Sequence, residues 1–274
     1  MKKPYANEPF TDFSLPQNVQ AFRAGLDQVR AQLGRTYPLI IGGEKIFTDE
    51  VIVSRNPAEP TQVIGRVSQA TPELADRAVR EAARAFDHWR RIAPAERARY
   101  LFSAARIMRE RKHLFSALLV LEAGKTWVEA DVDTAEAIDF LEFYGREMLR
   151  LGKPHPTHPE PNHETELHYV PLGVGVVIPP WNFPNAIVTG MTSATIVTGN
   201  TAVLKPASAT PVMAAWLAEL FVDELHLPAG VLNYLPGPGG AVGDVLVDHP
   251  LTRFVAFTGS KEVGIRIHQR AAAV

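Results

Sequence analysis

The stretch that decides the fold is Gly173-Val174-Gly175-Val176-Val177-Ile178-Pro179-Pro180-Trp181-Asn182-Phe183-Pro184. Residues 174–178 form a continuous apolar run rich in β-branched side chains, which is typical of a strand buried on both faces of a parallel sheet. The prolines that follow predict a stiff turn, because proline fixes φ and has no backbone N–H to donate. We therefore expect a buried parallel strand that ends in a rigid loop.

The alternation of strand and helix continues to the last residues of the sequence. Helical patterns are expected over 184–198, 211–225, 241–247 and 261–272, and strands over 201–204, 231–235 and 254–257. Alternation over about 100 residues predicts an α/β fold with a doubly wound, parallel, Rossmann-like sheet. We assign residues 171–274 to this sheet, a fold that commonly binds nucleotides.

The preceding residues divide into three segments. Residues 1–53 read as an arm, a helix over 18–33 and short strands at 39–41, 46–47 and 51–53. Residues 54–152 read as a helical segment packing on the nucleotide domain, since Pro72 and Pro94 suit first helical positions and Gly124 suits a helix end. Residues 153–170 are rich in proline and histidine, and we predict a linker with a candidate oligomerisation strand at 167–170.

The composition is that of a globular protein. Of the 274 residues, 46% are hydrophobic and 21% charged, and the formal net charge is −2. This balance argues against nucleic acid as a partner, and no polybasic block, long apolar run or secretory signal is visible, so we predict no membrane association and a cytoplasmic location. Cysteine is absent, which excludes a thiol nucleophile or thiolate metal site within these residues.

The loops after the predicted parallel strands are the expected place for a ligand. Asn182 lies in the stiff turn and could present its amide to an oxyanion, although an asparagine in a turn is commonly structural. Lys205 ends the second strand and could reach a ligand or merely extend to solvent. Gly259 and Ser260 begin the last helix, where a pyrophosphate or an ordinary N-cap would fit.

The residues after the second predicted strand do not decide between NAD and NADP as the cofactor. The acid that usually binds the adenosine ribose is missing after the second strand, and Ser208 lies there instead, so both NAD and NADP are compatible with the sequence. The sequence has no complete G-x-G-x-x-G motif in this region.

Two further groups of polar residues have simpler interpretations. The histidines of the proline-rich region could suggest a metal site, but their setting favours a solvated loop, and we predict no metal site; they are His155, His158, His163 and His168. The acidic residues of the helix at 128–151 are expected to form mostly a solvated face; they are Glu129, Asp131, Asp133, Glu136 and Asp139.

Three motifs taken together resemble the aldehyde dehydrogenase superfamily. They are Ile178-Pro179-Pro180-Trp181-Asn182-Phe183-Pro184, Leu204-Lys205-Pro206-Ala207-Ser208 and Phe257-Thr258-Gly259-Ser260. The resemblance covers essentially the whole chain. Residues 8–11, 37–39, 122–125, 129–140 and 245–250 are similar to the branch that oxidises L-glutamate γ-semialdehyde to L-glutamate in proline degradation.

The resemblance implies a role for each matching residue. Asn182 matches the amide of the oxyanion hole. The positions that match the cofactor site, for NAD or alternatively NADP, are Ile178, Pro180, Trp181, Lys205, Ser208, Gly239, Gly259 and Ser260. Among them, Lys205 matches a ligand of the adenosine ribose, Gly239 a neighbour of the adenine and Ser260 a pyrophosphate contact. Glu136 and Phe183 match positions near the aldehyde substrate.

The sequence departs from the family where the chemistry is performed. The family needs a cysteine thiolate to attack the aldehyde and a glutamate to activate water, and both are expected downstream of Val274. The resemblance therefore implies that residues 171–274 are an incomplete NAD(P)-binding domain. We expect a truncated enzyme that lacks the catalytic domain, is inactive alone and is a homo-oligomer when complete. The alternatives are a non-catalytic nucleotide-binding module that docks on a separately encoded C-terminal half, and an aldehyde dehydrogenase for another semialdehyde.

Overall fold

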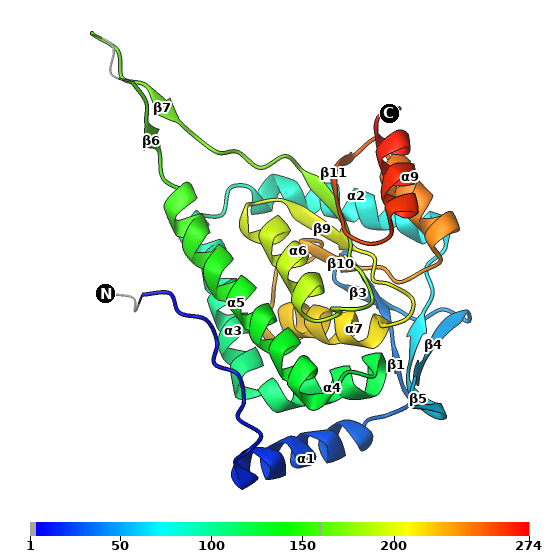
Figure 1. Ribbon diagram of the computed structural model, residues 1–274. Helices are drawn as coiled ribbons and strands as arrows, with labels where there is room; N and C mark the ends of the chain where they lie inside the picture. The colour runs from blue at the N-terminus through cyan, green and yellow to red at the C-terminus, as the bar shows by residue number, and fades with distance from the viewer. Residues whose placement is uncertain (1–3, 159–160, 274) are drawn as a thin grey trace.

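Parallel strands form the centre of the computed structural model, which describes residues 4–158 and 161–273 (Figure 1). In spatial order they are β11 (Thr252–Phe257), β8 (Val174–Ile178), β9 (Thr201–Leu204) and β10 (Leu232–Tyr234). Neighbouring strands pair in parallel, with one irregularity between Thr252 and Phe254. The predicted α/β class with a parallel sheet is therefore confirmed.

Helices cover both faces of this sheet. On one face lie α2 (Pro72–Trp89) and α8 (Asp244–Asp248), and on the other α6 (Ala186–Val197) and α7 (Pro211–Glu219). Outside them, α3 (Pro94–Glu110) and α5 (Trp127–Leu151) pack on α6, α4 (Lys112–Ala123) on α5 and α7, α1 (Pro16–Arg30) on α4, and α9 (Lys261–Ala271) on α8. Successive strand side chains point to opposite faces. Val177 and Leu204 belong to the core that includes α3 to α7, whereas Val176 and Val203 belong to a second core with α2 and α8. Two separate cores on one sheet are what a doubly wound fold requires.

A hairpin from the first part of the chain extends the sheet. β2 (Leu39–Ile41) pairs antiparallel with β10, and β3 (Glu44–Ile46) pairs with β2. Gly42 and Gly43 form the turn with φ of 60° and 84°, a conformation that glycine adopts without steric penalty. The short strands were predicted, but their pairing with β10 at the edge of the parallel strands was not.

A second sheet corrects the prediction that residues 54–152 form a helical segment. Its order is β1 (Arg35–Tyr37), β5 (Glu59–Ser68) and β4 (Val51–Asn56), so that residues 54–68 are largely extended. The Asn56 side chain accepts a hydrogen bond from the backbone N–H of Ala58 at 2.9 Å, which makes a tight turn between β4 and β5. Helix begins only at Pro72, where Thr71 caps the N–H of Leu74.

Several helix ends differ from their predicted positions. The first helix spans 16–30 and not 18–33, because Pro16 occupies its first turn. The predicted helix over 211–225 is α7 followed by a π-helical turn at Leu220–Glu224, and the one over 241–247 is a π-helical turn at Gly239–Gly243 followed by α8.

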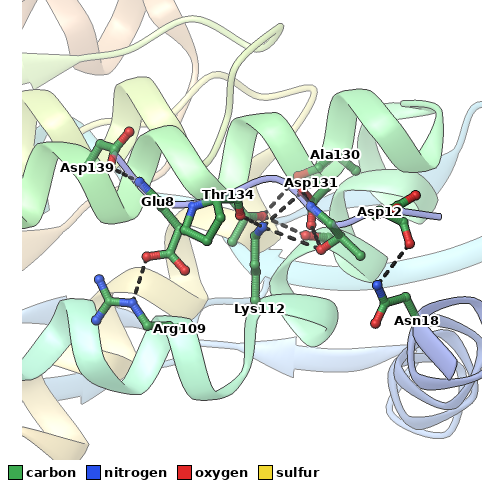
Figure 2. Close-up of polar contacts among 12 residues, drawn as sticks. Glu8, Asp12, Asn18, Arg109, Lys112, Ala130, Asp131, Thr134 and Asp139 are labelled. Carbon is green, nitrogen blue, oxygen red and sulfur yellow. Dashed lines mark hydrogen bonds and ion pairs between the residues drawn. The ribbon is translucent and has the colours of Figure 1, made fainter. Parts of the chain in front are cut away.

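The N-terminal arm is fastened across α5, α3 and α4 (Figure 2). The N–H of Glu8 donates to Asp139 at 2.6 Å, while its carboxylate accepts from Arg109 at 2.7 Å. Further along the arm, the side chain of Lys112 donates to the carbonyl of Pro9 and pairs with Asp131 at 2.9 Å. These contacts fix the arm to residues that are 100 or more positions away in the sequence.

The region after α5 extends away from the rest of the molecule (Figure 1). The described part of it contains the hairpin of β6 (His155–Pro156) and β7 (Glu166–Leu167). Of the predicted oligomerisation strand at 167–170, Leu167 lies in β7, and Tyr169 and Val170 are exposed. Within residues 4–158 and 161–273, no helix combines the length and apolarity needed to cross a bilayer.

Candidate functional site

A cleft of about 640 Å³ opens at the carboxyl ends of the parallel strands. The loops that follow β8, β9 and β11 line it, together with residues 239–247 and the start of α9. The predicted site residues that it brings together are Ile178, Pro180, Trp181, Asn182, Lys205, Gly239, Gly259 and Ser260. These residues are far apart in the sequence and meet because all the parallel strands end at one edge.

The proline-rich turn after β8 presents two side chains to this cleft. Trp181 is 60% exposed, and Asn182 beside it is also exposed. The hydroxyl of Thr210, which lies before α7, donates to the carbonyl of Trp181 at 3.4 Å and joins this turn to the loop after β9. The turn thus holds an amide donor and a flat aromatic surface at the rim of the cleft.

Lys205 brings a buried positive charge to the cleft. It is only 6% exposed, and burial lowers the pKa of its ammonium group. In the described part of the chain, the ammonium group has neither an ion-pair partner nor a hydrogen bond. A buried and unpaired ammonium is unfavourable unless a ligand or water accepts its hydrogen bonds. The prediction that Lys205 ends a strand beside a ligand cleft therefore agrees with its position.

The remaining wall of the cleft suits a phosphate-containing ligand. Ser260 is the N-cap of α9, and its hydroxyl accepts a hydrogen bond from the N–H of Val263 at 3.3 Å. Unpaired N–H groups and the helix dipole favour an anion at such a helix start. Elsewhere in the lining of the cleft, a Cβ atom added at Gly239 would meet no atom within 4 Å, so this glycine leaves open space to the cleft.

Three of the predicted site residues lie outside the lining of this cleft. Ser208 is exposed on the loop after Pro206. Phe183 is 40% exposed and its ring lies 3.8 Å from the ammonium of Lys125. Glu136 lies on α5, where burial first and the charge of Asp133 second raise the pKa of its carboxyl group.

The acidic residues of α5 are not mainly a solvated face, which corrects the sequence interpretation. Asp133 is fully buried, accepts the backbone N–H of Ala186 at 2.6 Å and forms an ion pair with Lys125 at 2.8 Å. Asp131 is 1% exposed and pairs with Lys112. A signal for Asp133 was present in the sequence, because positions 130, 133, 134, 137 and 141 fall on one helical face and none of the other four is charged.

Sequence reasoning also missed Glu122. Its carboxylate is 3% exposed and accepts hydrogen bonds from the N–H groups of Val212 and Met213, both at 2.8 Å, and from the hydroxyl of Ser54. Burial raises the pKa of Glu122 to about 7, and these hydrogen bonds oppose that shift. Across the described residues, no group of three or more His, Cys, Asp or Glu side chains could hold a metal ion.

Comparison with known proteins agrees with this geometry. The sequence profile of the aldehyde dehydrogenase family matches residues 47–274. The chain is 60% identical to 1-pyrroline-5-carboxylate dehydrogenase of Geobacillus thermodenitrificans over all 274 residues, which are 53% of that protein. The protein of the same name from Bacillus cereus is 58% identical over 270 residues and 52% of its own length.

Solved structures give the same result. The structure of 1-pyrroline-5-carboxylate dehydrogenase from Thermus with bound NAD has a TM-score of 0.95 and 46% identity, over 98% of this chain and 52% of that one. Proline utilization A from Bdellovibrio bacteriovorus has a TM-score of 0.96 and 38% identity, over 99% of this chain and 28% of that one. The chain thus spans about half the length of the curated relatives that it matches. On its sequence and its fold, it belongs to the aldehyde dehydrogenase family.

Proposed function

We propose that this chain supplies the NAD-binding cleft and one amide donor of an enzyme that oxidises L-glutamate γ-semialdehyde to L-glutamate in proline degradation. The observation that carries the proposal is the single cleft that gathers Trp181, Asn182, Lys205 and Ser260. The names of the relatives and the NAD in the Thermus structure support the choice of cofactor and substrate.

The residues of the cleft fit a dinucleotide. The ammonium of Lys205 donates to the adenosine ribose, and Gly239 leaves room for the adenine. Ser260 and the first N–H groups of α9 bind the pyrophosphate, where the helix dipole favours negative charge. Trp181 and Asn182 then lie at the nicotinamide end. When bound, NAD⁺ accepts the hydride that leaves the substrate carbon.

Asn182 acts on the substrate oxygen. Its side-chain amide donates a hydrogen bond to the aldehyde oxygen as negative charge develops there, and the prolines on either side hold the donor in place before the reaction. Phe183 and Glu136 line the approach of the substrate carbon chain. The sequence has no cysteine, so a thiolate nucleophile would have to come from residues outside these 274.

Two further properties belong to the proposal. The complete enzyme is a cytoplasmic homo-oligomer, and the exposed apolar side chains near β7 form part of its interface; they are Leu167, Tyr169, Val170 and Leu172. Light scattering of the complete enzyme tests the assembly, and a monomer at micromolar concentration would overturn it.

Calorimetric titration of the purified chain with NADH tests the proposed function. We expect saturable binding with one site per chain. NADH should also quench the fluorescence of Trp181, and the W181F variant should keep binding in the calorimeter while it loses most of the quenching. Absence of heat in the wild-type titration would refute the cofactor site. Oxidation of glutamate γ-semialdehyde by the chain alone would refute the external nucleophile.

A further inference from the structure

The junction between α4 and α5 is linked by polar contacts to the starts of two helices that follow loops of the cleft. It consists of Glu122-Ala123, the last two residues of α4, and of Gly124-Lys125, which follow them, and we call it the Glu–Lys corner. Gly124 has a φ of 68°, which ends α4 in a left-handed turn and lets the chain reverse toward α5. Glu122, at one end, contacts the start of α7. Lys125, at the other end, pairs with Asp133, which contacts the start of α6.

The first branch holds the start of α7. Glu122 accepts the N–H groups of Val212 and Met213, which are in the first turn of that helix. The N-cap residue of α7, Thr210, makes no side-chain capping bond of its own. The loop directly before this helix begins with Lys205, so Glu122 fixes the end of the segment that carries the buried lysine.

The second branch holds the start of α6. Asp133 accepts the N–H of Ala186 at 2.6 Å and also that of Asn185, and Lys125 balances its charge at 2.8 Å. The N-cap residue Asn185 provides no side-chain capping bond to α6. The turn directly before this helix carries Asn182, and Lys125 additionally lies over the ring of Phe183.

Both helices that follow the two ligand loops therefore receive their caps from other elements. Glu122 of the Glu–Lys corner caps α7, and Asp133 of α5, which pairs with Lys125 of that corner, caps α6. We infer that Glu122 and Asp133 are positioning residues, with Glu122 aligning the adenosine end of the cleft and Asp133 the nicotinamide end. This inference rests on the proposed dinucleotide site. Under this inference, each carboxylate affects the binding of one half of the ligand. If the two carboxylates only stabilised the fold, the two halves would be affected alike.

Two ligands distinguish the adenosine end of the cleft from its nicotinamide end in one experiment. ADP occupies only the adenosine and phosphate end, whereas NADH occupies both ends. Dissociation constants of both are measured by calorimetry at pH 8, where Glu122 is ionised, for the wild type, E122Q, D133A and D133N. The control E219Q changes a carboxylate of α7 that pairs with Arg35 and not with the helix start, and D139N changes one of α5 that holds only the N-terminal arm.

A net hydrogen bond of about 1.4 kcal/mol corresponds to about tenfold in affinity. E122Q keeps one acceptor for two N–H groups, so ADP and NADH should both weaken about tenfold. D133A should weaken NADH about tenfold and ADP by less than about twofold. D133N should restore most of the NADH affinity, because its side-chain oxygen can still accept from Ala186. Both controls should bind like the wild type.

Equal losses for both ligands in D133A, or wild-type affinities in E122Q and D133A, would overturn the inference. If E122Q or D133A does not fold, as judged by circular dichroism, D133N and the wild type are compared by hydrogen exchange of residues 182–187 and 205–213 with ADP bound. Increased exchange confined to 182–187 in D133N supports the assignment, and increased exchange in both segments contradicts it. A wild-type chain that binds neither ligand would refute the proposed function itself.

Discussion

The substitution Lys205→Met should raise the stability of the free chain and lower its affinity for NADH. Methionine keeps most of the apolar stem but removes an ammonium from a side chain that is only 6% exposed and has no partner among residues 4–158 and 161–273. Because burial disfavours the charged form of Lys205, its replacement by methionine should gain about 1 kcal/mol in unfolding free energy. The same change removes a charged hydrogen bond to the ligand worth about 1.5–3 kcal/mol, which is about 10- to 150-fold in the dissociation constant.

The two effects are measured on the same preparation by urea unfolding without ligand and by calorimetry with NADH. The matched control is Lys153→Met, which removes an exposed lysine outside the lining of the cleft and should change either quantity little. A K205M variant that is less stable than the wild type would refute the reasoning, because it would show that the lysine is satisfied within the protein. Unchanged NADH affinity would equally refute its role at the cleft.

The remaining predictions concern stability. Lys112→Met leaves the carboxylate of Asp131 buried without its ion pair and should lower the unfolding free energy by about 3 kcal/mol in urea; a loss below about 1 kcal/mol would contradict this. The pKa of Glu122 is about 7 in the folded chain against 4.5 for the free group, so the unfolded state releases this proton first as pH rises. Glu122 should therefore reduce stability by about 3 kcal/mol between pH 4.5 and 7, and E122Q should lose this dependence in parallel urea titrations. Gly124→Ala places a Cβ at positive φ and 2.8 Å from Pro57, so calorimetric unfolding should show a loss of at least about 1 kcal/mol, and an unchanged midpoint would refute the strain.

The cleft could be predicted because its geometry follows from topology. Once residues 174–178, 201–204 and 254–257 are read as parallel strands, the loops that follow them must gather at one edge of the sheet. This reasoning places Asn182, Lys205 and Ser260 together without knowledge of any side-chain contact, and the structure confirms that they share one cleft.

The parts that were not predicted depend on contacts between distant segments. β5 was missed because apolar and polar residues alternate only weakly along it, and its stability comes from pairing with β4 and β1. Asp131 and Asp133 were assigned to solvent because a carboxylate is rarely buried. Their partners, Lys112 and Lys125, are not distinguishable from other lysines until the fold brings them within 3 Å.

A common physical reason connects these missed residues. The cleft itself is lined mainly by proline, glycine and apolar side chains, which cannot by themselves hold two loops at a defined separation. Backbone N–H groups at the starts of α6 and α7 need acceptors, and neither N-cap side chain supplies one. Carboxylates from α4 and α5 satisfy them at distances of 2.6–2.8 Å, in surroundings where a hydrogen bond to a charged group is strong. The unfavourable burial of these charges is therefore offset by the same bonds that set the shape of the cleft, so the stability of the fold and the alignment of the site depend on the same few atoms.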